Sequence, residues 1–599
     1  MAPQRRLTDG APPRHVGQGT AGVEHAGERP TPASLVITPE LLRAVAGRAG
    51  RPDYPRFEAQ LRSSGYCARP VRLQGRVETS DQTGRRRVWS TATEPDGILR
   101  KACGNRREAV CAPCAERYRQ DAYHLIAAGL RGGKGVPESV VEHPAVFVTF
   151  TAPSFGLVHT RPLGSDGRAR RCRPRRAALV CEHGVRLSCG QVHDDDDPRL
   201  GEPLCLDCFD HEGAVAWNNA LGELWRRTTI YLPRRLARHI GMTQERLKGL
   251  VRVRYVKVTE YQRRGLVHVH AVMRLDRAMP AYRAHEIRLP PTGFTAELLE
   301  DAIRDTAAEV CAPLADELGG GTVHWGHELD VRQLDSDERR EIAGYLAKYA
   351  TKSTEQVGGL LHPIDREHID RALVREHVRC YLRAAFRLHD ACHAAAKQRA
   401  AADAARRSLA PPGAEPARDG NLLARRAAQA MSRGERVHLR LRDGAELVGR
   451  IVRWSPNRTP PELALDGGHV LPLAEVKVIA AARRAPRDRH DRRLAKCAHA
   501  LGYRGHCLTK SRQYSTTFTA LRAAREHHVH ERVLADSWDA AQRMLAETDP
   551  NQRVASFRYV GQGHLTAADA LLAASAAGRA REQRAAARLE RAMGDRDGR

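Results

Sequence analysis

The sequence VRVRYVKVTEYQRRGLVHVHAVMRL, residues 251–275, has two runs of alternating, Val-rich residues on either side of a polar turn that contains Gly. This pattern predicts a β-hairpin with strands over 251–258 and 267–273. Apolar side chains alternate with polar ones along both runs, so one face of each strand can be buried. We therefore expect this stretch to supply two neighbouring antiparallel strands.

Two histidines of the second strand form a candidate metal site. His268 and His270 are two residues apart, so a strand points both imidazoles to the same face. Glu260 lies on the preceding strand and adds a carboxylate. Nitrogen and carboxylate ligands suit divalent ions such as Mg, Mn or Zn. The alternative for so short a pattern is a pair of histidines on a half-exposed strand.

A predicted helix at residues 338–354, ERREIAGYLAKYATKST, carries two tyrosines on one face. Tyr345 and Tyr349 are four residues apart, which places them about one turn from each other. Lys348 and Lys352 lie beside them. Tyrosines at helical spacing are usually core residues, but their combination with lysines and a preceding pair of strand histidines is much rarer than either feature alone.

These stretches carry a resemblance to a known family, and they occur in its order: VFVTFTAPS (146–154), TEYQRRGLVHVHAVMRL (259–275) and YLAKYATKSTE (345–355). The chain resembles the HUH endonucleases, specifically the RepSA-type rolling-circle replication initiators of actinobacterial plasmids and integrative elements. Further similar segments are KACGNRREAVCAPC (101–114), WNNALGELW (217–225) and LGYRGHCLTKSRQYSTTFTALRAAR (501–525). The likeness covers about 70–570, with an interruption near 400–485.

The resemblance implies an α+β fold in which an HUH-type antiparallel sheet is flanked by helices. In the family, the strand that corresponds to residues 146–151 lies beside the metal-bearing strand, which brings Thr149 or Thr151 near the DNA. A divalent cation, Mg or Mn, is expected on His268 and His270. The expected third ligand is Glu260, and either Glu328 or His327 is the alternative.

The implied activity is nicking of one strand at a replication origin. Tyr349 is expected to attack the scissile phosphate, and Tyr345 to perform a second transfer that ends the round. The products are a 5′-phosphotyrosine and a free 3′-hydroxyl that primes a host polymerase. Lys348 and Lys352 are expected to stabilise charge on the phenolate and phosphate. No P-loop motif occurs, so strand separation would require a host helicase.

Charge and composition indicate an anionic partner. The 599 residues carry a net charge of +27, and arginines occur throughout the chain. This distribution favours nucleic acid, here origin DNA in duplex and single-stranded form. No apolar run has the ~20 residues that a membrane helix needs, so we expect a cytoplasmic protein without a membrane partner. Its 14 cysteines would then be reduced, and clustered ones would bind metal.

Two groups of cysteines are predicted to bind structural zinc. The first contains Cys67, Cys103, Cys111 and Cys114, where the C-x-x-C pair can form one edge of a tetrahedral site. The second is a Cys/His-rich insertion at 172–211, for which the simplest ligand set is Cys181, Cys189, Cys205 and Cys208. His183 and His193 compete with these cysteines, and more than one site is possible here. Four aspartates at 194–197 are expected to form a solvated turn.

The predicted domain order places the catalytic hairpin in the middle of the chain. It consists of a disordered N-terminus (1–35), a zinc-ribbon-like region (36–135), the HUH catalytic domain (136–406), a linker (407–432), a small β-barrel-like insert (433–482) and a helical, basic C-terminal region (483–599). Lys510 and Arg512 of the last region are predicted to contact duplex DNA. Cleavage of single-stranded DNA is assigned to 146–355.

Three other functions compete with this prediction. A two-tyrosine HUH transposase shares a zinc-ribbon-like front end and the same motif order. A relaxase fits less well, because relaxases carry the tyrosine ahead of the histidines. A non-catalytic, zinc-containing DNA-binding regulator would not require His268, His270, Tyr345 and Tyr349, all of which are present.

Overall fold

The computed structural model describes most of the chain, namely residues 36–80, 86–175, 179–352, 354–408, 420–432, 436–443, 445–458, 460–466, 468–481, 494–536 and 553–597. The predicted disordered terminus (1–35) and residues 409–419 of the predicted linker lie outside them. The chain divides into two compact units. The larger contains Arg106–Val110 and Ala115–Glu531, and the smaller contains the described residues of Met1–Asn105, Cys111–Cys114 and Arg532–Arg599.

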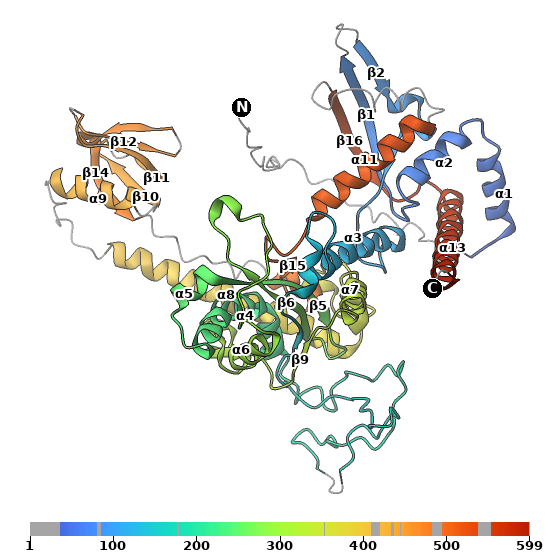
Figure 1. The fold of residues 1–599 in the computed structure, drawn as a ribbon, viewed down its shortest axis with the longest axis horizontal. Helices are drawn as coiled ribbons and strands as arrows, with labels where there is room; N and C mark the ends of the chain where they lie inside the picture. The colour runs from blue at the N-terminus through green and yellow to red at the C-terminus, as the bar shows by residue number, and fades with distance from the viewer. Residues whose placement is uncertain are drawn as a thin grey trace. The chain divides into compact units, whose positions relative to one another are not determined.

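A five-stranded antiparallel sheet is the framework of the larger unit (Figure 1). Its order is β15-β5-β6-β4-β9, with bounds Leu508–Lys510, Val251–Tyr261, Val267–Arg277, Ala145–Phe150 and Leu329–Gln333. The predicted hairpin is confirmed, since β5 and β6 pair along their whole length. The strand predicted at 146–151 is β4, and it lies beside β6.

Helices cover both faces of this sheet. One face packs against α4 (His211–His239), α6 (Ala296–Glu309) and α8 (Glu376–Ser408), and the other against α3 (Ala112–Arg131) and α7 (Glu338–Tyr349). Figure 1 shows α4 and α6 on one side of the central strands and α7 on the other. This unit also contains the shorter elements α5 (Gln244–Leu250), β7 (Cys311–Pro313), β8 (Thr322–His324) and α10 (Leu494–Cys497).

Part of the C-terminal region belongs to this core. The sequence pattern predicts only helices after residue 490, but Leu508–Lys510 forms β15 and pairs with β5. Tyr514 is fully buried and donates a hydrogen bond to the Ile126 carbonyl, and α11 (Phe518–Asp536) begins with a ring that stacks on Tyr118. A fragment that ends near Asp403 would lack these contacts. Residues 494–521 therefore pack into the same core as the strands that carry the predicted cleavage residues.

The smaller unit contains a second antiparallel sheet. In it β1 (Val71–Ser80) pairs with β16 (Arg553–Gln562), β2 (Arg86–Ser90) and β3 (Leu99–Lys101). Its helices are α1 (Pro39–Ala49), α2 (Tyr54–Ser63) and α13 (Ala567–Asp597). The two ends of the chain thus share one sheet. Strand β16 is a second exception to the wholly helical C-terminal region that the sequence predicts.

The insert at 433–482 is an open sheet, so the predicted barrel is wrong. Its order is β13-β12-β11-β10-β14, with bounds Val470–Pro472, Glu462–Leu465, Glu446–Ser455, Arg436–Leu441 and Val476–Ala481. Among the described residues, β13 and β14 are the two edges and do not pair. Helix α9 (Gly420–Ser432), in the predicted linker, packs Ala427 and Ala430 on the apolar face that closure would otherwise bury.

Candidate functional site: a tyrosine–histidine pocket

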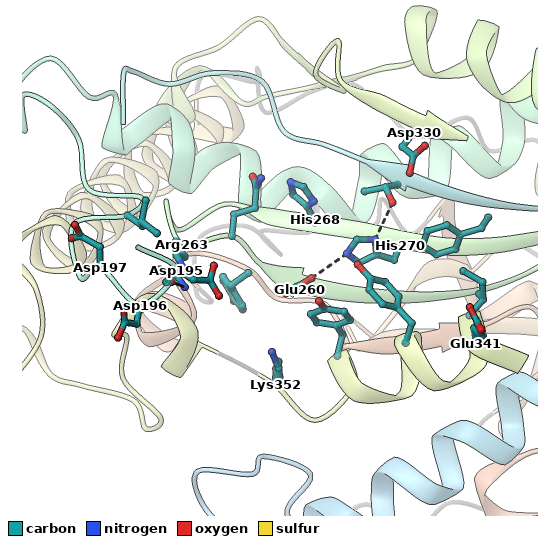
Figure 2. A pocket seen from close by; sticks show the side chains of 18 of the residues that line it. Asp195, Asp196, Asp197, Glu260, Arg263, His268, His270, Asp330, Glu341 and Lys352 are labelled. Atoms are coloured by element: carbon teal, nitrogen blue, oxygen red, sulfur yellow. Dashed lines mark hydrogen bonds and ion pairs between the residues drawn. The ribbon is translucent and has the colours of Figure 1, made fainter. Parts of the chain in front are cut away.

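A cavity of about 1200 Å³ lies on the α7 face of the larger unit's sheet. We name it the tyrosine–histidine pocket after the residues that line it, among them Glu260, His268, His270, Tyr345, Tyr349 and Lys352. Figure 2 labels Glu260, His268, His270 and Lys352, with Asp195, Asp196 and Asp197 at one side of the pocket. The structure thus brings together all but Lys348 of the residues that the sequence predicts for cleavage.

His270 is held between the two strands that flank β6. Its Nδ1 lies 3.0 Å from Thr149 Oγ1 on β4, and its Nε2 lies 3.1 Å from Glu260 Oε2 on β5. A neutral imidazole satisfies both contacts when it donates from Nε2 to the carboxylate and accepts at Nδ1 from the hydroxyl. The ring of Phe147 stacks on the imidazole at a centroid distance of 6.0 Å. Thr149, which the resemblance places near DNA, is therefore the residue that orients His270.

His268 has an unsatisfied nitrogen in the same pocket. It pairs in register with Glu260, and its ring centroid is 5.9 Å from that of His270. Its Nε2 is buried and has no hydrogen-bond partner among the described residues. Burial lowers the pKa of His268 to about 3, and the neighbouring His270 and Arg264 add to this shift. The imidazole is therefore neutral near pH 7, as a metal ligand must be.

The donor set fits a divalent cation. A cation on His268, His270 and Glu260 would supply the partner that His268 Nε2 lacks and would replace the hydrogen bond between the other two. Imidazole nitrogen with one carboxylate suits ions such as Mn or Zn, and carboxylate and water suit Mg. In this structure the three ligand atoms are less closely gathered than those of the cysteine clusters described below.

The two tyrosines approach His270 from α7. The ring centroids of Tyr345 and Tyr349 are 4.7 Å apart, and they lie 5.6 and 5.7 Å from the His270 ring. The helix positions both rings because residues four apart share one face. The ammonium groups of Lys352 and Lys348 lie 5.0 and 5.9 Å from the centre of the Tyr349 ring. Both cations thus lie closest to Tyr349.

The environments of the two phenols differ. Burial raises the pKa of Tyr345, and its hydrogen bond to Tyr349 raises this pKa further. Burial and the charge of Glu260 also raise the pKa of Tyr349, but its hydrogen bond with Tyr345 opposes the increase. The contact between the two hydroxyls thus lowers the pKa of Tyr349 and raises that of Tyr345. Tyr349 is the more easily ionised of the pair.

Sequence reasoning missed several residues of this pocket. Asp195, Asp196 and Asp197, expected to form a solvated turn, line it together with Arg263, Asp330, Arg332 and Arg375. No local pattern identified the loop, because its position depends on contacts with residues far away in the chain. The alternative ligands His327 and Glu328 are exposed and are not part of the pocket lining. Glu260 is the carboxylate that contacts His270.

The two residues predicted to contact duplex DNA differ in exposure. The Lys510 ammonium donates to the carbonyls of Arg512 and Ser515 at 2.9 and 3.0 Å, so it stabilises the loop after β15. Arg512 is exposed. Arg512 is therefore the better candidate for a phosphate contact, and Lys352 remains a candidate inside the pocket.

Four cysteines of the smaller unit form a compact cluster. Cys67, Cys103, Cys111 and Cys114 come together as predicted, with Sγ–Sγ distances of 3.5 Å (Cys67–Cys114) and 3.7 Å (Cys67–Cys111 and Cys103–Cys114). A tetrahedral zinc ion with Zn–S bonds of about 2.3 Å separates its sulfur ligands by about 3.8 Å. The cluster therefore has the dimensions of a closed structural zinc site.

Replacing Cys111 and Cys114 with Ser should release one zinc ion per chain and lower the thermal midpoint. A loss of a few kcal/mol corresponds to roughly 5–10 °C for a unit of this size. Zinc content and a thermal melt, measured beside the exposed-cysteine control Cys311→Ser, check this expectation. Wild-type protein that contains no zinc would contradict it.

The Cys/His-rich insertion holds two clusters where the simplest prediction has one. Cys181, Cys205 and Cys208 gather with His183, whereas Cys189 lies with His159, Cys172 and His193. The predicted set of four cysteines is therefore divided, because a tight turn brings His183 to the other three while Cys189 pairs with Arg173. His159 precedes the insertion and was not predicted as a ligand.

No helix in the part of the chain that the structure describes combines the length and apolar character that crossing a bilayer requires.

The fold and the pocket define a protein in which an antiparallel sheet presents two histidines and a carboxylate to a pair of helical tyrosines. The model of the RepSA family, “Replication initiator protein, pSAM2”, matches residues 53–411 and 457–578. A replication initiator protein of Streptomyces ambofaciens is 34% identical over 563 residues, which span 90% of this chain and 94% of the relative. No solved structure matches. The chain belongs to the RepSA family of replication initiators.

Proposed function

We propose that this replication initiator nicks one strand of its origin DNA by tyrosine transesterification, in the manner of an HUH endonuclease. The observation that carries the proposal is the convergence of His268, His270 and Glu260 with Tyr345 and Tyr349 in one pocket. Membership of the replication initiator family supports an origin as the DNA target. The net charge of +27 supports binding of a polyanion.

His268, His270 and Glu260 would hold a Mg or Mn ion. When bound, such an ion supplies Lewis-acid polarisation of the scissile phosphate. Thr149 keeps His270 in the orientation that this requires, because its hydroxyl is fixed to Nδ1. The phosphate would lie between the histidines and the tyrosines. Lys352 lies on the tyrosine side of the pocket and would neutralise part of the phosphate charge.

Tyr349 is assigned the first attack. A phenol has an ordinary pKa near 10, so nucleophilic attack at neutral pH depends on stabilisation of the phenolate. The Tyr345 hydroxyl lowers the pKa of Tyr349, and the ammonium groups of Lys352 and Lys348 lie 5.0 and 5.9 Å from the centre of its ring. Burial and the hydrogen bond with Tyr349 raise the pKa of Tyr345 and outweigh the charge of Arg332, which lowers it. Once Tyr349 is esterified, Tyr345 is free to perform the second transfer.

The step conserves the energy of the phosphodiester bond. As the Tyr349 oxygen bonds to phosphorus, the bond from phosphorus to the 3′-oxygen breaks. The phenol proton is lost to the pocket, and the departing 3′-oxygen gains a proton. The products are a 5′-phosphotyrosine and a 3′-hydroxyl that a host polymerase can extend. In the second transfer Tyr345 attacks the newly copied origin, forms its own phosphotyrosine and releases a 3′-hydroxyl. That hydroxyl attacks the phosphorus held by Tyr349, the Tyr349 phenol leaves with a proton, and the strand is reclosed.

Mapping the nick on the parent element tests this proposal. Full-length protein with Mn or Mg is incubated with single-stranded oligonucleotides that tile the DNA around its gene. We expect one oligonucleotide to give a covalent adduct at its new 5′ end and a 3′ end that a polymerase extends. Binding without any adduct across the whole set would instead support a non-catalytic DNA-binding regulator.

A further inference from the structure

The segment between β4 and α4 has no regular secondary structure among its described residues. Residues 151–210 contain neither helix nor strand in the part that the structure describes, and only isolated bridges connect them. Several of its apolar side chains are exposed, including Leu163, Val180 and Val192. A segment of this size without a hydrophobic core needs another source of stability, and bound metal is a common one.

One cluster in this segment has the dimensions of a zinc site. His159 Nδ1 lies 3.3 Å from His193 Nε2, Cys189 Sγ lies 3.5 Å from the same Nε2, and Cys172 Sγ lies 4.0 Å from His159 Nδ1. Tetrahedral zinc with Zn–N bonds of about 2.0–2.1 Å and Zn–S bonds of about 2.3 Å separates two nitrogens by about 3.3 Å and a nitrogen from a sulfur by about 3.6 Å. The measured edges are close to these values.

We propose that His159, Cys172, Cys189 and His193 bind a zinc ion of their own, separate from the ion expected on Cys181, His183, Cys205 and Cys208. All four ligand atoms lie within 4.8 Å of one another. The Thr160 amide donates to Cys172 Sγ at 3.2 Å, a contact that stabilises a thiolate. The site is closed by four protein ligands, so its role is structural.

Asp197 is not a ligand itself, but it accepts a hydrogen bond from the ligand His193. Its Oδ2 lies 2.7 Å from His193 Nδ1, which leaves Nε2 with its lone pair directed at the cluster. Asp197 also accepts hydrogen bonds from the Arg199 guanidinium. A carboxylate behind a ligating histidine fixes the ring and strengthens metal binding, typically 10- to 100-fold. The cluster therefore has both the four ligand side chains of a metal site and a carboxylate that orients one of them.

The same aspartate connects this zinc site to the tyrosine–histidine pocket. Asp195, Asp196 and Asp197 line the pocket, and Arg263 donates to the Asp195 carbonyl. Arg375, also in the lining, donates to the Pro198 carbonyl at 2.9 Å. Zinc at His193 would therefore hold one wall of the pocket in place. This consequence rests on the proposed function, whereas the existence of the zinc site does not.

Zinc counting tests the proposal in a chain that carries His268→Ala and His270→Ala, so that an ion in the pocket is not counted. We expect three zinc ions per chain, bound by nine sulfur and three nitrogen ligands in X-ray absorption. Two ions with eight sulfur ligands would overturn the proposal. This measurement needs no substitution in the cluster, so it remains informative if cluster variants fail to fold.

A second test compares the zinc lost by single and double variants of the two clusters in the insertion. In the same background, Cys189→Ser and Cys205→Ser should each remove one zinc ion, and the double variant should remove two. If Cys189 shared a site with Cys205, the double variant would lose only one, and the proposal would be overturned. Asp197→Asn should retain three ions but release one to a chelator 10- to 100-fold more readily. The matched control Asp194→Asn, in the same loop and exposed, should leave release unchanged.

Discussion

Replacing Tyr349 with Phe is expected to abolish the covalent adduct with origin DNA while leaving DNA binding intact. The substitution removes only the hydroxyl, so the ring still packs against Tyr345 and His270. Without a nucleophile on that ring, the first transfer has no route that preserves the phosphodiester energy. Adduct formation on a single-stranded origin oligonucleotide, followed on a denaturing gel, measures the first transfer, and a binding titration measures affinity.

The neighbouring tyrosine should give a different result. Tyr345→Phe should retain the first nick but impair strand closure, since the second transfer is assigned to it. Tyr282→Phe is a matched control, because Tyr282 is 80% exposed and lies outside the pocket. Equal loss of adduct from Tyr345→Phe and Tyr349→Phe, or loss from Tyr345→Phe alone, would reverse or remove the assigned order.

The pH dependence of the first nick is a second test of Tyr349 as the nucleophile. The pKa of Tyr349 is raised above its ordinary value near 10, so the phenolate fraction increases about tenfold per pH unit below that value. The rate of nicking should therefore rise with pH from 7 to 9 without reaching a plateau. Tyr345→Phe removes the hydrogen bond that lowers the pKa of Tyr349, so its first nick should still occur but should be slower at each pH in this range. A flat profile in both proteins would mean that phenol ionisation does not limit the step.

The sequence could predict those parts of the fold in which apolar or functional residues recur at the spacing of a single strand or helix. Alternation over 251–275 predicts the hairpin, and the two-residue spacing of His268 and His270 predicts their common face. Four-residue spacing does the same for Tyr345 and Tyr349. In each case the geometry follows from one strand or one helix. The structure adds that Glu260 and His268 are in register, which fixes the carboxylate beside the histidines.

The parts that sequence could not predict depend on pairing between distant segments. Strand β15 has three residues and no alternation long enough to detect, yet it pairs with β5 and so completes the five-stranded sheet of the larger unit. Strand β16 pairs with β1 from the other end of the chain. The ligand role of His159 and the position of the 195–197 loop arise in the same way. Cysteine spacing located the metal-binding segments but could not divide their ligands, because the division depends on turns within the insertion.

Substituting both His268 and His270 with Ala is expected to lower nicking by about a hundredfold or more, with the fold and structural zinc content unchanged. Lewis-acid stabilisation of a phosphoryl transition state is worth several kcal/mol, and 1.4 kcal/mol corresponds to about a factor of ten in rate. Neither imidazole belongs to a cysteine cluster, so the variant should still release the zinc of all three clusters on denaturation. Single-turnover nicking across a range of Mn concentrations measures the loss.

The third ligand is decided by matched substitutions in the same assay. Glu260→Gln should weaken Mn dependence and lower nicking, because Glu260 contacts His270 and pairs with His268. His327→Ala and Glu328→Gln should leave both unchanged, because these exposed residues are not part of the pocket lining. Thr149→Val should give an intermediate loss, since it frees His270 Nδ1 and leaves every ligand in place. Full nicking by the double-alanine variant would show that the histidines do not support the chemistry, and the tyrosines would then have to act through the neighbouring lysines alone.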